Sequence, residues 1–193
     1  MDKRILVLAG PTGVGESTIT NEIIKRFPIF KRLTTATSRK PRGNEKNKID
    51  YYFFSEENFR KEISSGNILE YTYIENRNTY YGAYKPDLED KLNSGFNIIV
   101  NVDIVGAKYY KEHFDSTTIF IAPESLDDLK ERIKKRSPDI SSEELDKRMR
   151  NAKDEMEKEM PYYDFIVVNA EGQLDKAVEE IVEIIKNEGY ELS

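Results

Sequence analysis

An uninterrupted apolar run followed by a glycine-rich turn constrains the fold more than any other feature of the sequence. Ile5–Ala9 reads Ile-Leu-Val-Leu-Ala, which is typical of a strand covered on both faces in a parallel sheet. A glycine-rich segment, residues 10–17, comes next, and apolar residues then recur at helical spacing until Pro28. The sequence therefore predicts a strand, a glycine loop and a helix as its first unit. The plainer interpretation is a tight strand-to-helix turn that binds nothing.

The glycine-rich segment reads Gly10-Pro-Thr-Gly-Val-Gly15-Glu16-Ser17 and matches the P-loop pattern G-x-x-x-x-G-K-S/T at every fixed position except the lysine. In such loops backbone N–H groups converge on phosphate oxygens, and the helix N-terminus adds its positive end. We therefore expect a triphosphate at this loop, with the Ser17 hydroxyl as a ligand of Mg²⁺. The expected ATP-binding residues are Gly10, Pro11, Thr12, Gly13, Val14, Gly15, Glu16, Ser17 and Thr18.

Glu16 stands where such loops carry a lysine, so it replaces a positive charge by a negative one. That lysine normally lies against the β- and γ-phosphates. Unit charges about 4 Å apart interact by roughly 1 to 4 kcal/mol, and loss of one stabilising donor costs other enzymes about 10²–10³ in rate. Glu16 therefore predicts weak ATP binding or severely reduced turnover, unless it turns to solvent and another cation serves instead.

The rest of the chain alternates buried strands with helices. Further strands are expected at 98–102, 117–121 and 165–168, and helices at 86–92 and 173–186. We predict a three-layer α/β fold built on a parallel sheet. Its P-loop NTPase core comprises residues 1–33, 85–124 and 161–193.

Two segments interrupt this alternation. Residues 34–84 predict a small mixed α/β lobe. Residues 125–160 predict a helical lid of two charged helices that begin at Ser125 and at Ser141 or Ser142. Their thin apolar stripe predicts loose packing, as in a flap over an active site or in a solvent-facing helical hairpin.

Composition excludes several classes of function. With 36 acidic residues against 30 Lys and Arg, the formal charge is -6, which argues against nucleic-acid and anionic-membrane binding. The chain has no cysteine, so disulfides and thiol chemistry are excluded and a cytoplasmic location is the default. The apolar run at the start is too short for a signal peptide, and no run approaches the roughly 18 residues of a membrane span. His113 is interpreted as a surface residue.

Separated motifs from residue 5 to about residue 185 resemble those of guanylate kinase. Residues 34–43, Thr-Thr-Ala-Thr-Ser-Arg-Lys-Pro-Arg-Gly, are similar to that family's S/T-T-R-x-P-R-x-G element. Asp50-Tyr51-Tyr-Phe, Leu69-Glu70-Tyr71 and Tyr80-Tyr81-Gly82 follow at the expected distances. The ordered set is specific, although each residue taken alone suits a basic turn or ordinary packing.

The resemblance implies a GMP site in the lobe. Two arginines three residues apart offer bidentate donors to a phosphate dianion, and tyrosine hydroxyls can complete its shell. A carboxylate such as that of Glu70 can accept from both N1–H and the 2-amino group of guanine, and Thr35 is a candidate for contact with the base. The GMP-binding residues implied are Thr35, Arg39, Arg42, Tyr51, Glu70, Tyr81, Ala83 and Asp103.

The resemblance also implies that Arg132, Arg136 and Arg148 belong to the lid that closes over ATP, and that Asn169 lies near the adenine. The lid arginines, together with the lysine position held by Glu16, form the expected catalytic set. Helices this charged also carry arginines for ordinary pairing, and Asp128 lies one turn before Arg132.

Three positions depart from the family pattern. The family's D-x-D-x-Q-G element reads Asn101-Val-Asp103-Ile-Val105-Gly, so one carboxylate that supports the Mg²⁺ shell is absent. Ala83 stands where a serine or threonine usually follows Tyr-Tyr-Gly.

The implied reaction is ATP + GMP to ADP + GDP with Mg²⁺, strongly impaired by Glu16, in a monomer or weak homodimer that takes part in purine nucleotide metabolism. One alternative is a catalytically inactive module that binds GMP or a protein. Another is a P-loop kinase for a different phosphorylated acceptor.

Overall fold

The computed structural model describes residues 3–193, and its chain divides into two compact units. One unit comprises Met1–Phe30 and Ile99–Ser193, and the other comprises Lys31–Ile98. The boundaries between the units fall after residue 30 and after residue 98, each within a strand of the larger sheet described next. None of the helices in residues 3–193 combines the length and the apolar composition needed to cross a membrane.

The larger sheet has five strands in the order β2-β7-β1-β8-β9. β1 pairs in parallel with β8, and β8 pairs in parallel with β9. Its strands are β1 Ile5–Ala9, β2 Phe30–Arg32, β7 Asn97–Asn101, β8 Thr117–Ala122 and β9 Phe165–Val168. The predicted parallel α/β core is confirmed, and the predicted strands agree with these bounds to within a residue.

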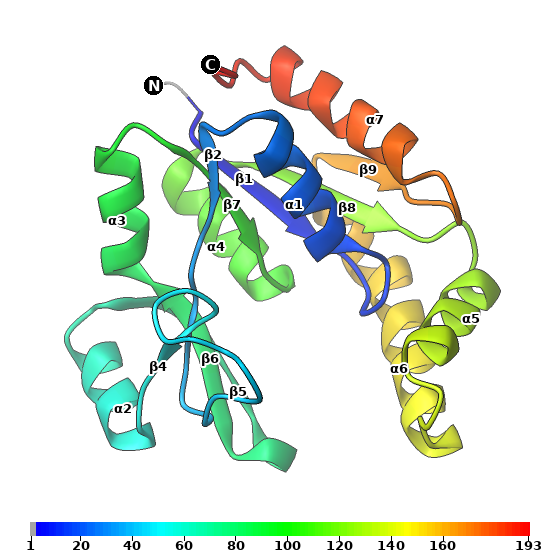
Figure 1. The fold of residues 1–193 in the computed structure, drawn as a ribbon, viewed down its shortest axis with the longest axis horizontal. Coiled ribbons are helices and arrows are strands. Elements are labelled where there is room, and N and C mark those ends of the chain that lie inside the picture. The colour runs from blue at the N-terminus through cyan, green and yellow to red at the C-terminus, as the bar shows by residue number, and fades with distance from the viewer. Residues whose placement is uncertain (1–2) are drawn as a thin grey trace. The chain divides into compact units, whose positions relative to one another are not determined.

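Helices cover both faces of this sheet. α1 (Glu16–Arg26) and α7 (Leu174–Asn187) lie against one face, and α4 (Ile104–Phe114) lies against the other (Figure 1). Alternate residues of the strands, such as Leu6 and Leu8, share a buried cluster with apolar residues of α1 and α7. This packing holds the carboxyl end of β1, from which the glycine loop departs.

Helix α4 was not predicted, because no helix was expected from the sequence between the strands at 98–102 and 117–121. Asp103 explains the difference. Its carboxylate accepts from the backbone N–H groups of Val105, at 3.0 Å, and Gly106, at 3.2 Å. It is therefore an N-cap, and such a cap is worth about 1 kcal/mol to a helix.

The predicted lid helices are α5 (Leu126–Arg136) and α6 (Ser142–Asp154), capped by Ser125 and Ser141. A π-helical turn, Glu155–Glu159, and a 3₁₀ turn, Met160–Tyr162, continue α6. The expectation of loose packing is wrong. The stripe is thin, but Leu129, Ile133 and Leu145 are all buried in the main apolar cluster.

The second unit is a mixed α/β structure, as predicted. Its sheet has the order β4-β3-β6-β5, with β3 antiparallel to β6 and parallel to β4. Phe59 and Tyr80 stack in its small core with ring centroids 5.3 Å apart. Its elements are β3 Ala36–Thr37, β4 Tyr52–Phe53, α2 Glu56–Ser64, β5 Ile68–Ile74, the 3₁₀ turn Glu75–Arg77, β6 Thr79–Tyr84 and α3 Lys85–Asn93.

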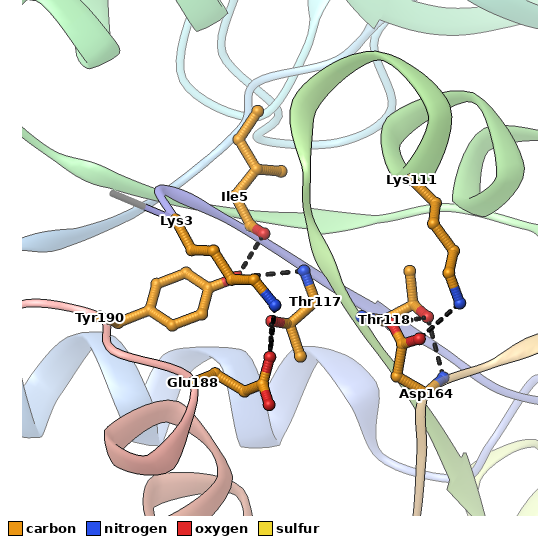
Figure 2. A network of polar contacts seen from close by, with 8 residues as sticks. All are labelled: Lys3, Ile5, Lys111, Thr117, Thr118, Asp164, Glu188 and Tyr190. Atoms are coloured by element: carbon orange, nitrogen blue, oxygen red, sulfur yellow. Dashed lines mark hydrogen bonds and ion pairs between the residues drawn. The ribbon is translucent and has the colours of Figure 1, made fainter. Parts of the chain in front are cut away.

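Buried and partly buried polar contacts tie the segments after α6 and after α7 to the larger sheet (Figure 2). The Tyr190 hydroxyl donates to the Ile5 carbonyl at 2.6 Å and accepts from the Thr117 N–H at 3.2 Å. Asp164 accepts from both the N–H and the hydroxyl of Thr118, at 2.9 and 2.8 Å. The second pair of contacts fixes the residues just before β9, and some of these line the cavity described next.

Candidate functional site

The glycine loop has the backbone shape that phosphate binding requires. Gly15 has φ 103° and is the N-cap of α1, which has no side-chain cap, so no capping side chain takes up the first N–H groups of the helix. A Cβ on Gly10 would lie 2.3 Å from the Ile121 carbonyl oxygen, which explains why this position needs glycine. Of the predicted ATP-binding side chains here, Val14 is buried, whereas Thr12, Ser17 and Thr18 are exposed.

A cavity of about 380 Å³ lies beside this loop. Residues from four places in the larger unit line it, namely the end of β1 with the loop, the end of β7 with the start of α4, β8, and the segment after α6. The lining residues are Ala9, Gly10, Thr12, Glu16, Asn101, Val102, Asp103, Ile104, Phe120, Glu155, Glu159 and Tyr163. Four of these are acidic, and within residues 3–193 the lining includes no Lys or Arg.

The carboxylates of this cavity perturb one another. Burial, with Glu159 and then Asp103, raises the pKa of Glu155 to about 7. Burial and Asp103 also raise the pKa of Glu159. Burial followed by the nearby acidic groups, Glu16 among them, raises the pKa of the Tyr163 hydroxyl. The cavity therefore disfavours further negative charge.

Asn101, which replaces the family's aspartate, is held by hydrogen bonds at the end of β7. Its Nδ2 donates to Thr20 Oγ1 at 3.2 Å and, weakly, to the Leu8 carbonyl at 3.5 Å. The Thr20 hydroxyl in turn donates to Asn101 Oδ1 at 3.2 Å. A carboxylate has no donor for the Leu8 carbonyl, so the amide suits this place, although it contributes no charge toward a cation.

Asn169, predicted to lie near the adenine, contacts the loop itself. Its Nδ2 donates to the Val14 carbonyl at 2.7 Å, and both residues are buried. A Cβ on Gly15 would lie 2.7 Å from the same nitrogen. The end of β9 therefore holds the glycine loop through one buried amide. Beside this contact is a second cavity, of about 190 Å³, lined in part by Gly13, Gly15 and Thr18.

The three arginines assigned to the lid occupy different surroundings. Arg132 lines the second cavity, donates to the Asn169 carbonyl at 2.8 Å, and lies 2.9 Å from a Glu171 oxygen. The pairing of Arg132 with Asp128, considered from the sequence, is not formed. Arg148 donates to Glu144 one turn away at 2.8 Å, and Arg136 is exposed near the end of α5. None of the three lines the cavity of about 380 Å³ beside the glycine loop, which we name the acidic cavity.

In the second unit, three of the predicted GMP-binding residues contact one another, and a fourth, Arg42, bonds through its backbone N–H to the Glu45 carboxylate that pairs with Arg39. Arg39 Nε donates to the Tyr81 hydroxyl at 3.0 Å, and its guanidinium carbon lies 4.9 Å from the centroid of the Tyr51 ring. The Tyr51 and Tyr81 rings meet edge to face with centroids 6.1 Å apart. The Arg42 side chain is exposed on the same turn. We name Arg39, Arg42, Tyr51 and Tyr81 the phosphate cluster, after the role that the sequence predicts for them.

The remaining predicted residues of this site are more dispersed. The Thr35 carbonyl accepts from the Tyr52 N–H at 2.8 Å. Glu70 is half-buried on β5, and Ala83 is fully buried on β6. Asp103 belongs to the other unit and caps α4.

Sequence reasoning missed Glu45, which lies within the phosphate cluster. Its two oxygens accept from Arg39 Nη1 at 2.6 Å and Nη2 at 2.8 Å, and one of them also accepts from the Arg42 N–H at 2.7 Å. Arg39, and to a lesser extent the Arg42 N–H, lower the pKa of Glu45 to about 2. A glutamate three residues after the second of two paired arginines was the only available signal.

Glu155 and Glu159 were also missed, because in the sequence they are two of many charges in a highly charged segment. In the structure both lie on the π-helical turn after α6 and line the cavity.

Comparison with known proteins gives one consistent family. The sequence profile of guanylate kinase matches residues 2–188. The guanylate kinase of Latilactobacillus sakei is 37% identical over 187 residues, which cover 95% of this chain and 89% of that protein. That of Prochlorococcus marinus is 32% identical, covering 96% of this chain and 98% of that protein. The crystal structure of guanylate kinase from Anaplasma phagocytophilum aligns with a TM-score of 0.74 at 26% identity, covering 98% of this chain and 88% of that one. The chain belongs to the guanylate kinase family.

Proposed function

We propose that this chain binds GMP and transfers to it the terminal phosphoryl group of ATP, giving GDP and ADP, and that Glu16 strongly reduces the rate. The phosphate cluster is the observation that carries the acceptor assignment. Two arginines and two tyrosines of one small lobe make up this cluster, and Arg39 contacts both aromatic side chains. Guanidinium groups and phenol hydroxyls are suited to a phosphate monoester dianion.

On this proposal each predicted residue has a distinct task. Arg39, Arg42, Tyr51 and Tyr81 bind the phosphate of GMP, and Glu70 accepts from the guanine edge, with Thr35, Ala83 and Asp103 nearby in the bound state. Residues 10–18 and Asn169 bind ATP. Arg132, Arg136 and Arg148 close over it. We further propose that residues 34–84 act as the GMP-binding lobe and 125–160 as the lid, inserted in a core of 1–33, 85–124 and 161–193.

The chain's residues suit a magnesium ion that arrives with the nucleotide. Mg²⁺ keeps much of its water and is held mainly by substrate phosphates with few protein ligands. Within residues 3–193 no group of three His, Cys, Asp or Glu side chains is arranged to hold a metal, whereas the exposed Ser17 hydroxyl at the start of α1 is a suitable oxygen ligand. When bound, the ion neutralises charge on the phosphates during transfer.

The predicted defect rests on the charge of the acidic cavity. In-line transfer of a phosphoryl group depends on positioning and on positive charge around the transferring oxygens. Glu16 contributes a carboxylate to a lining that already includes Asp103, Glu155 and Glu159. We infer that the ATP half is impaired while the GMP half retains its donors.

An assay of ADP release tests the proposal. ATP is supplied with GMP, with AMP or with no acceptor, to the parent chain and to Glu16→Lys. We expect GMP-dependent turnover to be low in the parent and to rise by about 10²–10³ in Glu16→Lys. If GMP-dependent turnover is no higher in Glu16→Lys than in the parent, and neither protein binds GMP, the proposed function is wrong. Ordinary kinase rates in the parent would instead refute the role given to Glu16.

Two alternatives are decided by the same measurements. An inactive module that binds GMP or a protein is favoured by the carboxylates around the loop, and it predicts GMP binding without turnover even in Glu16→Lys. A kinase for another phosphorylated acceptor is favoured by Ala83, whose fully buried methyl group offers the nucleotide no hydrogen bond. It predicts turnover that GMP does not stimulate.

A further inference from the structure

Lys108 of helix α4 lies beside the acidic cavity without lining it. It lines a neighbouring cavity of about 190 Å³ between α4 and the segment before β9, which we name the α4 cavity. Ile104 and Tyr163 line both cavities. The two cavities therefore adjoin each other at these side chains, and all of these residues belong to the unit that carries the glycine loop.

Helix geometry directs Lys108 toward the acidic cavity. Lys108 comes four residues after Ile104 on α4, so the two side chains lie on one face of the helix, one turn apart. Side chains of a helix lean toward its N-terminus, and α4 begins at its cap Asp103, which lines the acidic cavity. Because a lysine stem is long and flexible, the Lys108 ammonium can extend past Ile104 toward that cavity.

The contact that now holds the Lys108 ammonium is a weak one. Lys108 is exposed, and its ammonium lies 4.2 Å from the centroid of the Tyr162 ring. The Tyr162 side chain is itself 57% exposed, and a cation–π contact contributes least at such exposed sites. The ammonium can therefore leave this ring at little cost when a phosphate offers it a better partner.

Lys108 already acts on the carboxylates of the acidic cavity. Burial raises the pKa of the Glu159 carboxyl most, and Asp103 adds to this effect, whereas Lys108 lowers the pKa. Of the main groups that shift the pKa of Glu155 or of Glu159, Lys108 is the one cation in the part of the chain that the structure describes. Its positive charge therefore reaches a lining in which negative charge accumulates.

We propose that Lys108 supplies part of the positive charge that the glycine loop lacks, its ammonium leaving the Tyr162 ring and turning toward the phosphates when ATP is bound. This inference rests on the proposed function, which places the phosphates of ATP beside residues 10–18. The charge comes from α4 and not from the loop, so it offsets Glu16 only in part. The plainer assignment, in which Lys108 only covers the Tyr162 ring, predicts that its charge has no effect on ATP.

The experiment measures by calorimetry how tightly ATP binds, in the presence of Mg²⁺, to variants of the full chain. Lys108→Met removes the charge and keeps a long side chain, and Lys108→Arg keeps the charge. Each is made in the parent and in the Glu16→Lys background. Lys176→Met is the matched control, because Lys176 is an exposed lysine of α7, on the face of the sheet opposite α4 (Figure 1). Thermal unfolding and the dissociation constant of GMP report on the fold of each variant.

We expect Lys108→Met to weaken ATP binding on the order of 10-fold in the parent. Lys108→Arg and Lys176→Met should bind ATP as the parent does, and GMP binding should be unchanged in all of them. In the Glu16→Lys background the loss caused by Lys108→Met should be much smaller, because the loop then carries its own cation. Equal ATP affinity in Lys108→Met and the parent, or an equal loss in both backgrounds, would overturn the proposal.

The remaining outcomes separate failure of this inference from failure of the proposed function. If ATP binds to Glu16→Lys and not to the parent, the proposed function stands, and Lys108 does not compensate for the loop. If ATP binds to neither protein, the proposed function fails first, and the role of Lys108 fails with it. An equal loss of ATP and GMP affinity in Lys108→Met would show that Lys108 supports the fold and not the ATP site.

Discussion

Glu16 and Glu45 are both carboxylates placed where a phosphate is expected, yet their surroundings differ. Glu45 is paired with both Nη atoms of Arg39, and this arginine lowers its pKa to about 2. Glu16 lines a cavity with three further acidic residues and, within residues 3–193, with no Lys or Arg. The Glu45 carboxylate is therefore neutralised by a bound guanidinium. The Glu16 carboxylate instead adds to negative charge that has already accumulated.

The largest expected effect comes from reversing the charge at the loop. Glu16→Lys should raise GMP-dependent kcat by about 10²–10³, because a cation then stabilises the charge on the transferring phosphoryl group. Glu22→Lys, which makes the same charge change further along α1, is the control in the assay of ADP release. Equal gains in both variants would mean that only the overall charge of the chain matters.

The next largest effect concerns Arg42, one of the two arginines of the phosphate cluster. Arg42→Ala should weaken GMP binding by roughly 10- to 100-fold, since charge-assisted hydrogen bonds contribute about 1.5–3 kcal/mol, and should leave ATP binding unchanged. Calorimetry with each nucleotide measures both constants. Arg60→Ala is the control, because Arg60 is an exposed arginine paired with Glu56 in the same unit. Equal loss of ATP affinity would contradict the separation of the two halves.

The pH dependence of stability probes the acidic cavity. The pKa of Glu155 is raised to about 7, by burial first. The folded protein therefore holds this proton to higher pH than the unfolded chain does. The neutral Glu155 carboxyl therefore contributes to the stability of the folded protein. This contribution is fully present below the ordinary glutamate pKa of about 4.3 and is lost as the pH rises through about 7.

Glu155→Gln should accordingly be more stable than the parent at pH 8 by about 1–3 kcal/mol, allowing for partial exposure, with little difference at pH 4.5. Urea unfolding at pH 8 and at pH 4.5 measures this difference in the free energy of unfolding. Glu157→Gln, in the same π-helical turn, should be as stable as the parent at both pH values. A constant difference between Glu155→Gln and the parent at all pH values would show that the cavity does not raise this pKa.

The smallest expected effect tests whether the shape of the loop is independent of its charge. Asn169→Ala leaves the buried Val14 carbonyl without its 2.7 Å donor and should cost about 1–2 kcal/mol of unfolding free energy. The cost should be the same in the Glu16→Lys background, because the contact involves no charged group. Asn151→Ala, at an exposed position of α6, is the control in urea unfolding. A cost that depends on residue 16 would show that loop shape and loop charge are coupled.

Much of the architecture was predictable because local patterns and tertiary packing agree. The apolar run Ile5–Ala9 forms a fully buried strand, and Ser55, Ser125 and Ser141 each cap the helix that follows. The sequence motifs singled out Arg39, Arg42, Tyr51 and Tyr81, which all belong to the second unit, and their role in binding GMP stays a prediction. Helix α4 was missed, and its cap, Asp103, was interpreted as a ligand-binding residue.

The sequence by itself determined the family, most of the strands and helices, and the loss of a positive charge at position 16, since these depend on residue types at fixed spacing. Only the tertiary structure decided which charges meet. It brings Glu155 and Glu159 into the lining shared with Glu16, pairs Glu45 with both Nη atoms of Arg39, and turns Asn169 onto the Val14 carbonyl. The physical reason is that electrostatic effects depend on distance and burial in space, which spacing along the chain does not specify outside a single helix or strand.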